Sequence, residues 1–208
     1  MSKLKKIAPR AQMEKAITIF KQHGGILRTT QAIRLGVHPS VLYAMRNSGD
    51  LEQVSRGIYR LADTPPLGDP DLVIVATRVP KGVICLISAL SFHELTTQIP
   101  HEIHLALPRG AEEPRLAHPP VKTYRFDKRA FREGVETHIL DGVRVKIYDP
   151  EKTIADCFKF RNRIGLDTAV EAVRLYRERR RVDADRLMRY AAICRIEKVI
   201  RPYLEVLL

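Results

Sequence analysis

The stretch that decides the N-terminal fold is TTQAIRLGVHPSVLYAMRNSGDLEQVSRGIYRL, residues 29–61. Its central part, 39–48, begins with a proline suited to a first helical turn and ends before Gly49, so we expect a helix there. Apolar residues recur in it at helical spacing: Val41, Leu42 and Met45. Two short runs, 51–55 and 58–61, then predict strands joined by a glycine turn. A helix followed by such a hairpin is typical of a winged helix-turn-helix.

The residues before this stretch supply the remaining helices of that fold. Residues 10–22 carry apolar side chains at helical spacing and end before Gly24 and Gly25. A short extended piece follows, and a second helix is expected over 31–35, with Gly36 providing the turn. The sequence therefore predicts a winged helix-turn-helix domain over 1–62.

The rest of the chain predicts a mixed α/β domain. Prolines and glycine at 63–70 predict a linker, and 71–208 is expected to form the second domain. We expect helices first, then strands, and then two or three helices after a helix that begins near Asp149. These elements are helices 71–78 and 84–96 and strands 102–107, 121–126, 135–140 and 143–148. Asp141-Gly142 predicts a hairpin. The expected class is α+β, ending in a helical bundle.

Positive charge is concentrated near the N-terminus. The chain holds 36 Lys and Arg against 24 acidic residues, a formal net charge of +12. Residues 1–61 hold 11 basic side chains against three acidic ones, a net charge of +8, and the remaining 147 residues carry only +4. Such an asymmetry indicates a nucleic-acid-binding segment attached to a more neutral domain. A solvated basic surface is the alternative.

The helix over 39–48 is the expected recognition helix, because the second helix of this motif enters the major groove while its other face packs in the core. Ser40 and Tyr43 are candidates for base or phosphate contacts, Arg46 lies one turn further along, and Asn47 is a weaker candidate. The other candidates for phosphate or minor-groove contacts are basic: Arg28 near the second helix, and Arg56 and Arg60 in the wing.

A second basic cluster follows a predicted helix near the C-terminus: Arg174, Arg177, Arg179, Arg180 and Arg181. It is either a solvated face or a contact for DNA or an acidic partner protein, and the sequence leaves both open.

Few other residues suggest chemistry. The widely spaced Cys85, Cys157 and Cys194 predict small core residues rather than a disulfide framework or a zinc site. His101 and His104 fall three apart in a strand-like stretch and would point to opposite faces, so no metal site is expected. No apolar run is long enough to cross a bilayer. We expect a non-enzymatic cytoplasmic protein without a cofactor or membrane partner.

Three stretches together resemble the AbiEi-type antitoxins of bacterial type IV toxin–antitoxin systems: residues 29–61, residues 83–108 (VICLISALSFHELTTQIPHEIHLALP) and residues 143–165 (VRVKIYDPEKTIADCFKFRNRIG). The resemblance implies an N-terminal domain that represses the operon, through promoter DNA with inverted repeats. It also implies a C-terminal domain that neutralises a nucleotidyltransferase-like toxin without a stable complex.

The resemblance implies no catalytic residues. Four residues match a recurring motif of the family: Asp149, Glu151, Lys152 and Asp156. Helix capping and packing explain these residues, so we interpret them as structural.

Two other hypotheses stay open. One is a nuclease with a DNA-binding front end, suggested by the mixed strands and by Glu102 and Asp141, although the acid-x-Lys spacing of such enzymes is missing. The other is a stand-alone regulator whose C-terminal domain senses a small ligand.

Overall fold

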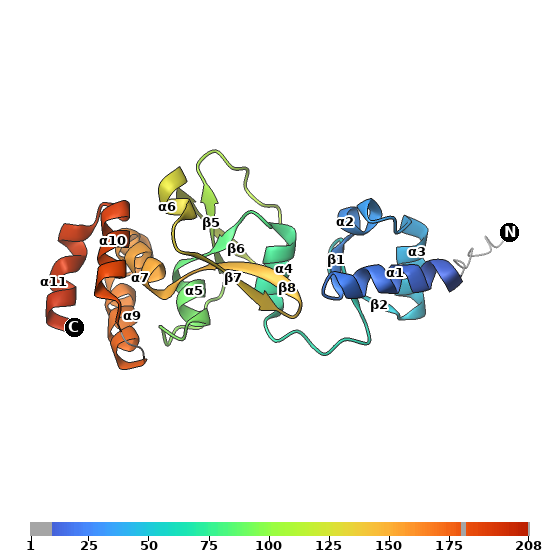
Figure 1. The fold of residues 1–208 in the computed structure, drawn as a ribbon, viewed down its shortest axis with the longest axis horizontal. Coiled ribbons are helices and arrows are strands. Elements are labelled where there is room, and N and C mark those ends of the chain that lie inside the picture. The colour runs from blue at the N-terminus through green and yellow to red at the C-terminus, as the bar shows by residue number, and fades with distance from the viewer. Residues whose placement is uncertain (1–9, 180–181, 208) are drawn as a thin grey trace. The chain divides into compact units, whose positions relative to one another are not determined.

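The computed structural model describes residues 10–179 and 182–207. Contacts divide the chain into two compact units. Figure 1 colours the chain by residue number, from blue at the N-terminus to red at the C-terminus. The first unit contains the residues up to Pro80 and the hairpin tip Ile139–Arg144. The second unit contains Lys81–His138 and the chain from Val145 onward. The fold is α+β, with helices and two sheets, as the sequence predicted.

The first unit is built from three helices and a small sheet, followed by a further helix. These are α1 (Arg10–Gln22), β1 (Ile26–Arg28), α2 (Thr29–Arg34), α3 (Pro39–Ser48), β2 (Leu51–Ser55), β3 (Ile58–Leu61) and α4 (Pro70–Arg78). The sheet has the order β1-β3-β2, and both pairings are antiparallel. Phe20, Leu42 and Met45 lie in the core between the helices and this sheet. This is the winged helix-turn-helix that the sequence predicted.

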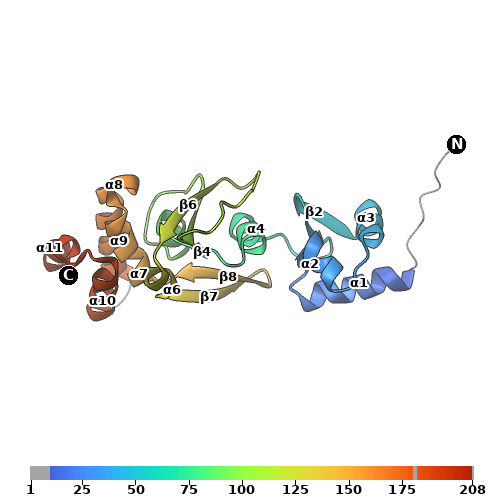
Figure 2. The same cartoon turned by 90° about the horizontal axis from the view of Figure 1, so that it is seen from above.

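The second unit is organised around a five-stranded sheet of order β6-β5-β4-β8-β7. Its strands are β4 (Val83–Ile84), β5 (Ile103–Pro108), β6 (Val121–Phe126), β7 (Val135–Leu140) and β8 (Val143–Tyr148). Its helices are α5 (Leu86–Phe92), α6 (Lys128–Arg132), α7 (Pro150–Lys159), α8 (Arg161–Ile164), α9 (Leu166–Arg179), α10 (Ala184–Cys194) and α11 (Glu197–Leu207). Figure 2 shows α7, α9, α10 and α11 grouped together as the expected helical bundle.

Aspartates begin several of these helices, because a carboxylate accepts hydrogen bonds from the free N–H groups of a first turn. Asp127 accepts from the amide of Ala130 at 3.0 Å, and Asp183 accepts from the amide of Arg186 at 2.9 Å. Asp149 caps α7 through the amide of Lys152 at 2.7 Å. The predicted capping role of Asp149 is thus confirmed.

The core of the second unit joins the sheet to the helical bundle. All three cysteines are free and buried in this unit, and burial raises the pKa of each thiol. The thiols therefore remain neutral and act as small apolar residues, as the sequence predicted.

The structure corrects the expected helix over 84–96. Ile84 belongs to a two-residue strand that pairs with Leu105 on one side and Ile147 on the other. The helix starts only at Leu86 and ends at Phe92. The short helix α6 was not predicted at all.

The boundary between the units falls after Pro80 rather than within the predicted linker at 63–70, and α4 belongs to the first unit. Within residues 10–179 and 182–207, every helix is too short or too polar to cross a lipid bilayer.

Candidate nucleic-acid interface

Helix α3 is held at both ends and along one face. The ring Nδ1 of His38 accepts a hydrogen bond of 3.2 Å from the amide of Ser40, and Pro39 occupies the first turn. Gly49 closes the helix in the left-handed conformation with φ of 87°. The inward face is fully buried: Val41, Leu42 and Met45. These contacts fix which side chains α3 presents to solvent.

The outward face of α3 carries all four residues that the sequence assigned to recognition. Ser40, Tyr43, Arg46 and Asn47 are exposed, and 53% of Tyr43 is accessible. Residues 40, 43 and 47 share one helix face because they are separated by three and four positions. The guanidinium carbon of Arg46 lies 5.6 Å from the ring centroid of Tyr43, which is within cation–π range. The face thus offers a hydroxyl, an aromatic ring, a guanidinium and an amide.

The wing is a short hairpin with a basic tip. Ser55 pairs with Ile58, so Arg56 and Gly57 alone form the turn, and Gly57 has φ of 72°. Arg56 is exposed at this turn. The carbonyl of Gly57 accepts a hydrogen bond of 2.9 Å from the amide of Thr29 at the start of α2. The tip is therefore anchored, and its arginine is presented to solvent.

Arg60 was expected to reach DNA from the wing, but its guanidinium is engaged within the unit. Nη2 donates to Glu52 at 2.8 Å and Nη1 donates to the carbonyl of Pro65 at 2.6 Å. Only 11% of the Arg60 side chain is exposed. The structure thus places Arg60 in a role that orders the chain after β3.

Arg28 is half-buried at the end of β1. Its Nη1 donates to the carbonyl of Arg78 in α4 at 3.3 Å. Its Nε is buried, and none of the described residues offers it a hydrogen-bond partner. Arg28 lines a cavity together with residues of α2 and α4 rather than standing free on the surface.

A groove beside α3 contains residues that the sequence analysis missed. It has a volume of about 470 Å³ and lies between α1 and the N-terminal end of α3, with Gln12, Lys15, His38 and Ser40 in its lining. Gln12, Lys15 and the apolar Ile19 are spaced by three and four residues on α1, so helical periodicity could have identified that they share one face of the helix. Lys15 is an additional cation beside α3.

The second arginine cluster is only partly described. Arg174 and Arg177 are exposed on α9, and Arg179 pairs with Glu94 at 2.7 Å. Arg180 and Arg181 lie outside the described residues. The role of this cluster in binding a partner stays a prediction.

The motif residues of α7 are buried rather than presented to a ligand. Lys152 pairs with Asp156, and both side chains are fully buried. Asp149 bonds to Arg186 and Tyr190, and the hydroxyl of Tyr176 donates to Glu151. Burial raises the pKa of Asp156 despite the neighbouring lysine. Glu151 thus ties α7 to α9, and Asp149 ties it to α10, whereas Lys152 and Asp156 pair within α7 itself.

The carboxylates of the nuclease hypothesis each have a separate partner. Glu102 pairs with Lys122 at 2.9 Å in the second unit. Asp141 accepts a hydrogen bond of 3.1 Å from the amide of Gly68 in the first unit.

The comparisons with known proteins agree with this geometry. Residues 14–62 match the family described as transcriptional regulator, AbiEi antitoxin. The N-terminal segment over residues 14–62 therefore resembles the AbiEi family. This AbiEi segment contains α3, the wing and most of α1, so the resemblance expected for residues 29–61 is confirmed.

Beyond the AbiEi segment, a likeness of fold covers most of the chain. The crystal structure of the RV2827C protein from Mycobacterium tuberculosis superposes with a TM-score of 0.58 at 14% sequence identity. The match covers 90% of this chain and 73% of that protein. Among curated proteins, none matches the chain.

Proposed function

We propose that this protein is a DNA-binding repressor of its own operon and the antitoxin of a nucleotidyltransferase-like toxin. The observation that carries the first part is the outward face of α3, with Ser40, Tyr43, Arg46 and Asn47 exposed on a helix whose inward face is locked in the core. That face lies in a segment of a transcriptional-regulator family. Promoter DNA is its proposed partner, in the cytoplasm.

In the proposed complex α3 lies in the major groove and the wing follows the backbone. Tyr43 and Arg46 are placed to reach base edges or the phosphates beside them. Arg56 at the wing and Lys15 beside α3 are placed to neutralise phosphates. Arg60 is left out of this contact set because Glu52 and Pro65 occupy its guanidinium.

The repressor function is tested by a gel-shift titration on the DNA immediately upstream of the gene, with random competitor DNA at low and moderate salt. We expect specific retardation that weakens steeply with salt, because phosphate contacts release counterions. The variant Tyr43→Ala/Arg46→Ala should lose specific retardation while its circular dichroism spectrum is unchanged.

The matched control is Arg201→Ala, which removes one exposed positive charge from α11 in the other unit. It should retain the affinity of the wild type. Equal affinity for operator and random DNA would overturn the repressor proposal. An equal loss of operator affinity in the control would show that the α3 variant acts only through the change in net charge.

The antitoxin part rests on the family of the N-terminal segment and on the resemblance of residues 83–108 and 143–165. The adjacent nucleotidyltransferase-like gene should be expressed from an unrelated inducible promoter, with and without this protein. Wild-type protein should restore growth, and so should Tyr43→Ala/Arg46→Ala, since neutralisation is assigned to the C-terminal part. Rescue that requires DNA binding would contradict this assignment.

A further inference from the structure

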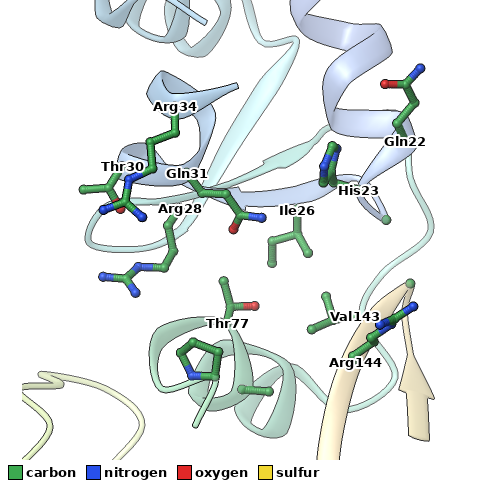
Figure 3. A pocket seen from close by; sticks show the side chains of 14 residues that line it. Gln22, His23, Ile26, Arg28, Thr30, Gln31, Arg34, Thr77, Val143 and Arg144 are labelled. Atoms are coloured by element: carbon green, nitrogen blue, oxygen red, sulfur yellow. The ribbon is translucent and has the colours of Figure 1, made fainter. Parts of the chain in front are cut away.

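A cavity of about 680 Å³ lies within the first unit, on the side of β1 and α2. We call it the arginine cavity, after the Arg28, Arg34 and Arg144 side chains in its lining. Figure 3 shows Arg28 and Arg34 toward one side of the cavity and Arg144 toward the other, with Thr77 of α4 pointing into the space between them. Every lining residue belongs to the first unit.

The lining is positively charged and has no compensating carboxylate. Arginine supplies three of its residues, and His23, Thr30 and Gln31 add polar groups, but no aspartate or glutamate is present among them. Within the described part of the chain, none of the three guanidiniums forms an ion pair. Elsewhere in the same unit arginines do find carboxylates, as Arg60 does with Glu52.

Arg28 shows most clearly that a partner is missing. Its Nη1 is held by the carbonyl of Arg78, which fixes the position of the guanidinium. Its Nε is buried and has no acceptor among the described residues. A buried charged donor without a partner is unfavourable, and such groups are usually satisfied by an ion, a water molecule or a ligand.

The size of the cavity indicates the size of its ligand. A volume of about 680 Å³ lies within the range of small-molecule sites and is far too small for a DNA duplex. Guanidinium groups bind phosphate oxygens in fork geometry, and several of them around one cavity match the several oxygens of a phosphorylated compound.

We propose that the arginine cavity binds a small phosphorylated anion. This goes beyond the proposed function, because the ligand is neither the operator nor the toxin. Its binding would involve β1 and α2, which precede the recognition helix in the chain. A regulator with such a site can sense a metabolite through its first unit, which also carries α3, rather than through its C-terminal domain.

The proposal is tested by isothermal titration calorimetry of the full chain with inorganic pyrophosphate, at ionic strength held constant with KCl. The test variant is Arg34→Gln/Arg144→Gln, because both side chains are exposed and make no ion pair whose loss would disturb the fold. The matched control is Arg115→Gln/Arg201→Gln, which removes two exposed charges outside the lining.

We expect saturable binding with one site, weakened at least tenfold in the test variant and unchanged in the control. Absence of saturable binding at millimolar pyrophosphate, or equal weakening in both double variants, would overturn the proposal. Loss of operator affinity in the test variant without any pyrophosphate binding would also overturn it, and would assign these arginines to the DNA backbone. Because the calorimetric readout contains no DNA, its failure is distinguishable from failure of the repressor function.

Discussion

Asp149, buried at the start of α7, accepts a hydrogen bond of 2.6 Å from Nη2 of Arg186 on α10. The same carboxylate oxygen accepts from the hydroxyl of Tyr190 at 2.7 Å, while the other oxygen caps the helix through the amide of Lys152. One side chain therefore both begins α7 and attaches it to α10. These two roles can be separated by substitution.

Asp149→Asn should keep the cap and remove the charge, whereas Asp149→Ala should remove both. We expect Asn to destabilise the second unit by about 1–3 kcal/mol, because Arg186 loses its charge-assisted bond. Ala should cost about 1 kcal/mol more for the lost cap. Urea unfolding followed by circular dichroism measures both, with the exposed Glu205→Ala as control. Equal destabilisation by Asn and Ala would show that the cap contributes nothing.

The second prediction concerns the contribution of the buried pair Lys152 and Asp156 to the free energy of unfolding. Lys152→Met should cost about 3–5 kcal/mol at neutral pH, because it leaves a buried carboxylate without a countercharge. The double variant Lys152→Met/Asp156→Leu should recover most of that loss, since two apolar side chains need no compensation. Urea unfolding of the three proteins gives the free energies. A double variant no more stable than the single one would refute this account.

The stability of the single variant Lys152→Met should also depend on pH differently from that of the wild type. Burial already raises the pKa of Asp156 with the lysine present, and removing the lysine raises it further. The folded state then binds a proton more readily than the unfolded state, so stability should increase as the pH falls toward the ordinary pKa of an aspartate and decrease as the pH rises. Flat stability between pH 7 and pH 4 would contradict this prediction.

His104 predicts the opposite dependence in the wild type. Burial lowers the pKa of His104 to about 4, even though Glu102 lies 3.6 Å from its Nε2. The unfolded chain therefore takes up a proton that the folded chain resists between about pH 6.5 and pH 4. Stability should fall by up to about 3 kcal/mol across this window as the pH is lowered.

The measurement for His104 compares wild type with His104→Gln in urea unfolding at several pH values. Other carboxyl groups titrate in the same window, so the difference between the two proteins is the relevant quantity. As the pH falls, the wild type should lose more unfolding free energy than His104→Gln does. Parallel profiles would exclude His104 as the titrating group.

Gly24 and Gly142 approach each other within the first unit, backbone against backbone. A Cβ added at Gly142 would lie 2.6 Å from the Cα of Gly24, and Gly142 has φ of 76°. Gly110 has a similar φ of 80°, but a Cβ there would meet nothing within 4 Å. The two positions thus share a backbone requirement and differ in packing.

Gly110→Ala should therefore cost about 1 kcal/mol for the left-handed backbone alone. Gly142→Ala should cost about 1–3 kcal/mol more, because the hairpin tip must move away from Gly24. Thermal unfolding followed by circular dichroism, with limited proteolysis of the hairpin, measures the difference. Equal losses in the two variants would mean that the glycine contact is unimportant.

Local signals made most of the first unit predictable. Pro39 and Gly49 mark the ends of α3, and helical periodicity in the sequence predicts its exposed face. Asp141-Gly142 marked the β7–β8 hairpin correctly. The strand at Ile84 was missed because its two residues are stabilised by partners distant in sequence, Leu105 and Ile147. Pattern alone cannot distinguish such a segment from a helix start.

The engagement of Arg60 was missed for a reason of register. A regular two-residue turn at Arg56-Gly57 would place Gln53 opposite Arg60. An irregularity between Gln53 and Ser55 shifts the pairing by one residue, so Glu52 lies opposite Arg60 instead. The salt bridge between Arg60 and Glu52 depends on that bulge, and no local sequence signal predicts the bulge.

The contact between Tyr43 and Arg46 predicts coupling in DNA recognition. The ring lies under the guanidinium at 5.6 Å, so it limits the rotamers that Arg46 adopts before binding. Each alanine variant should weaken operator binding by about 1–3 kcal/mol. The double variant should lose less than the sum of the two, because each residue works partly through the other. Tyr43→Phe keeps the ring and should preserve most of this coupling. Gel-shift titrations of the wild type, the two single alanine variants and the double variant complete this double-mutant cycle. Strict additivity of the losses in binding free energy would show that the two residues contact DNA independently.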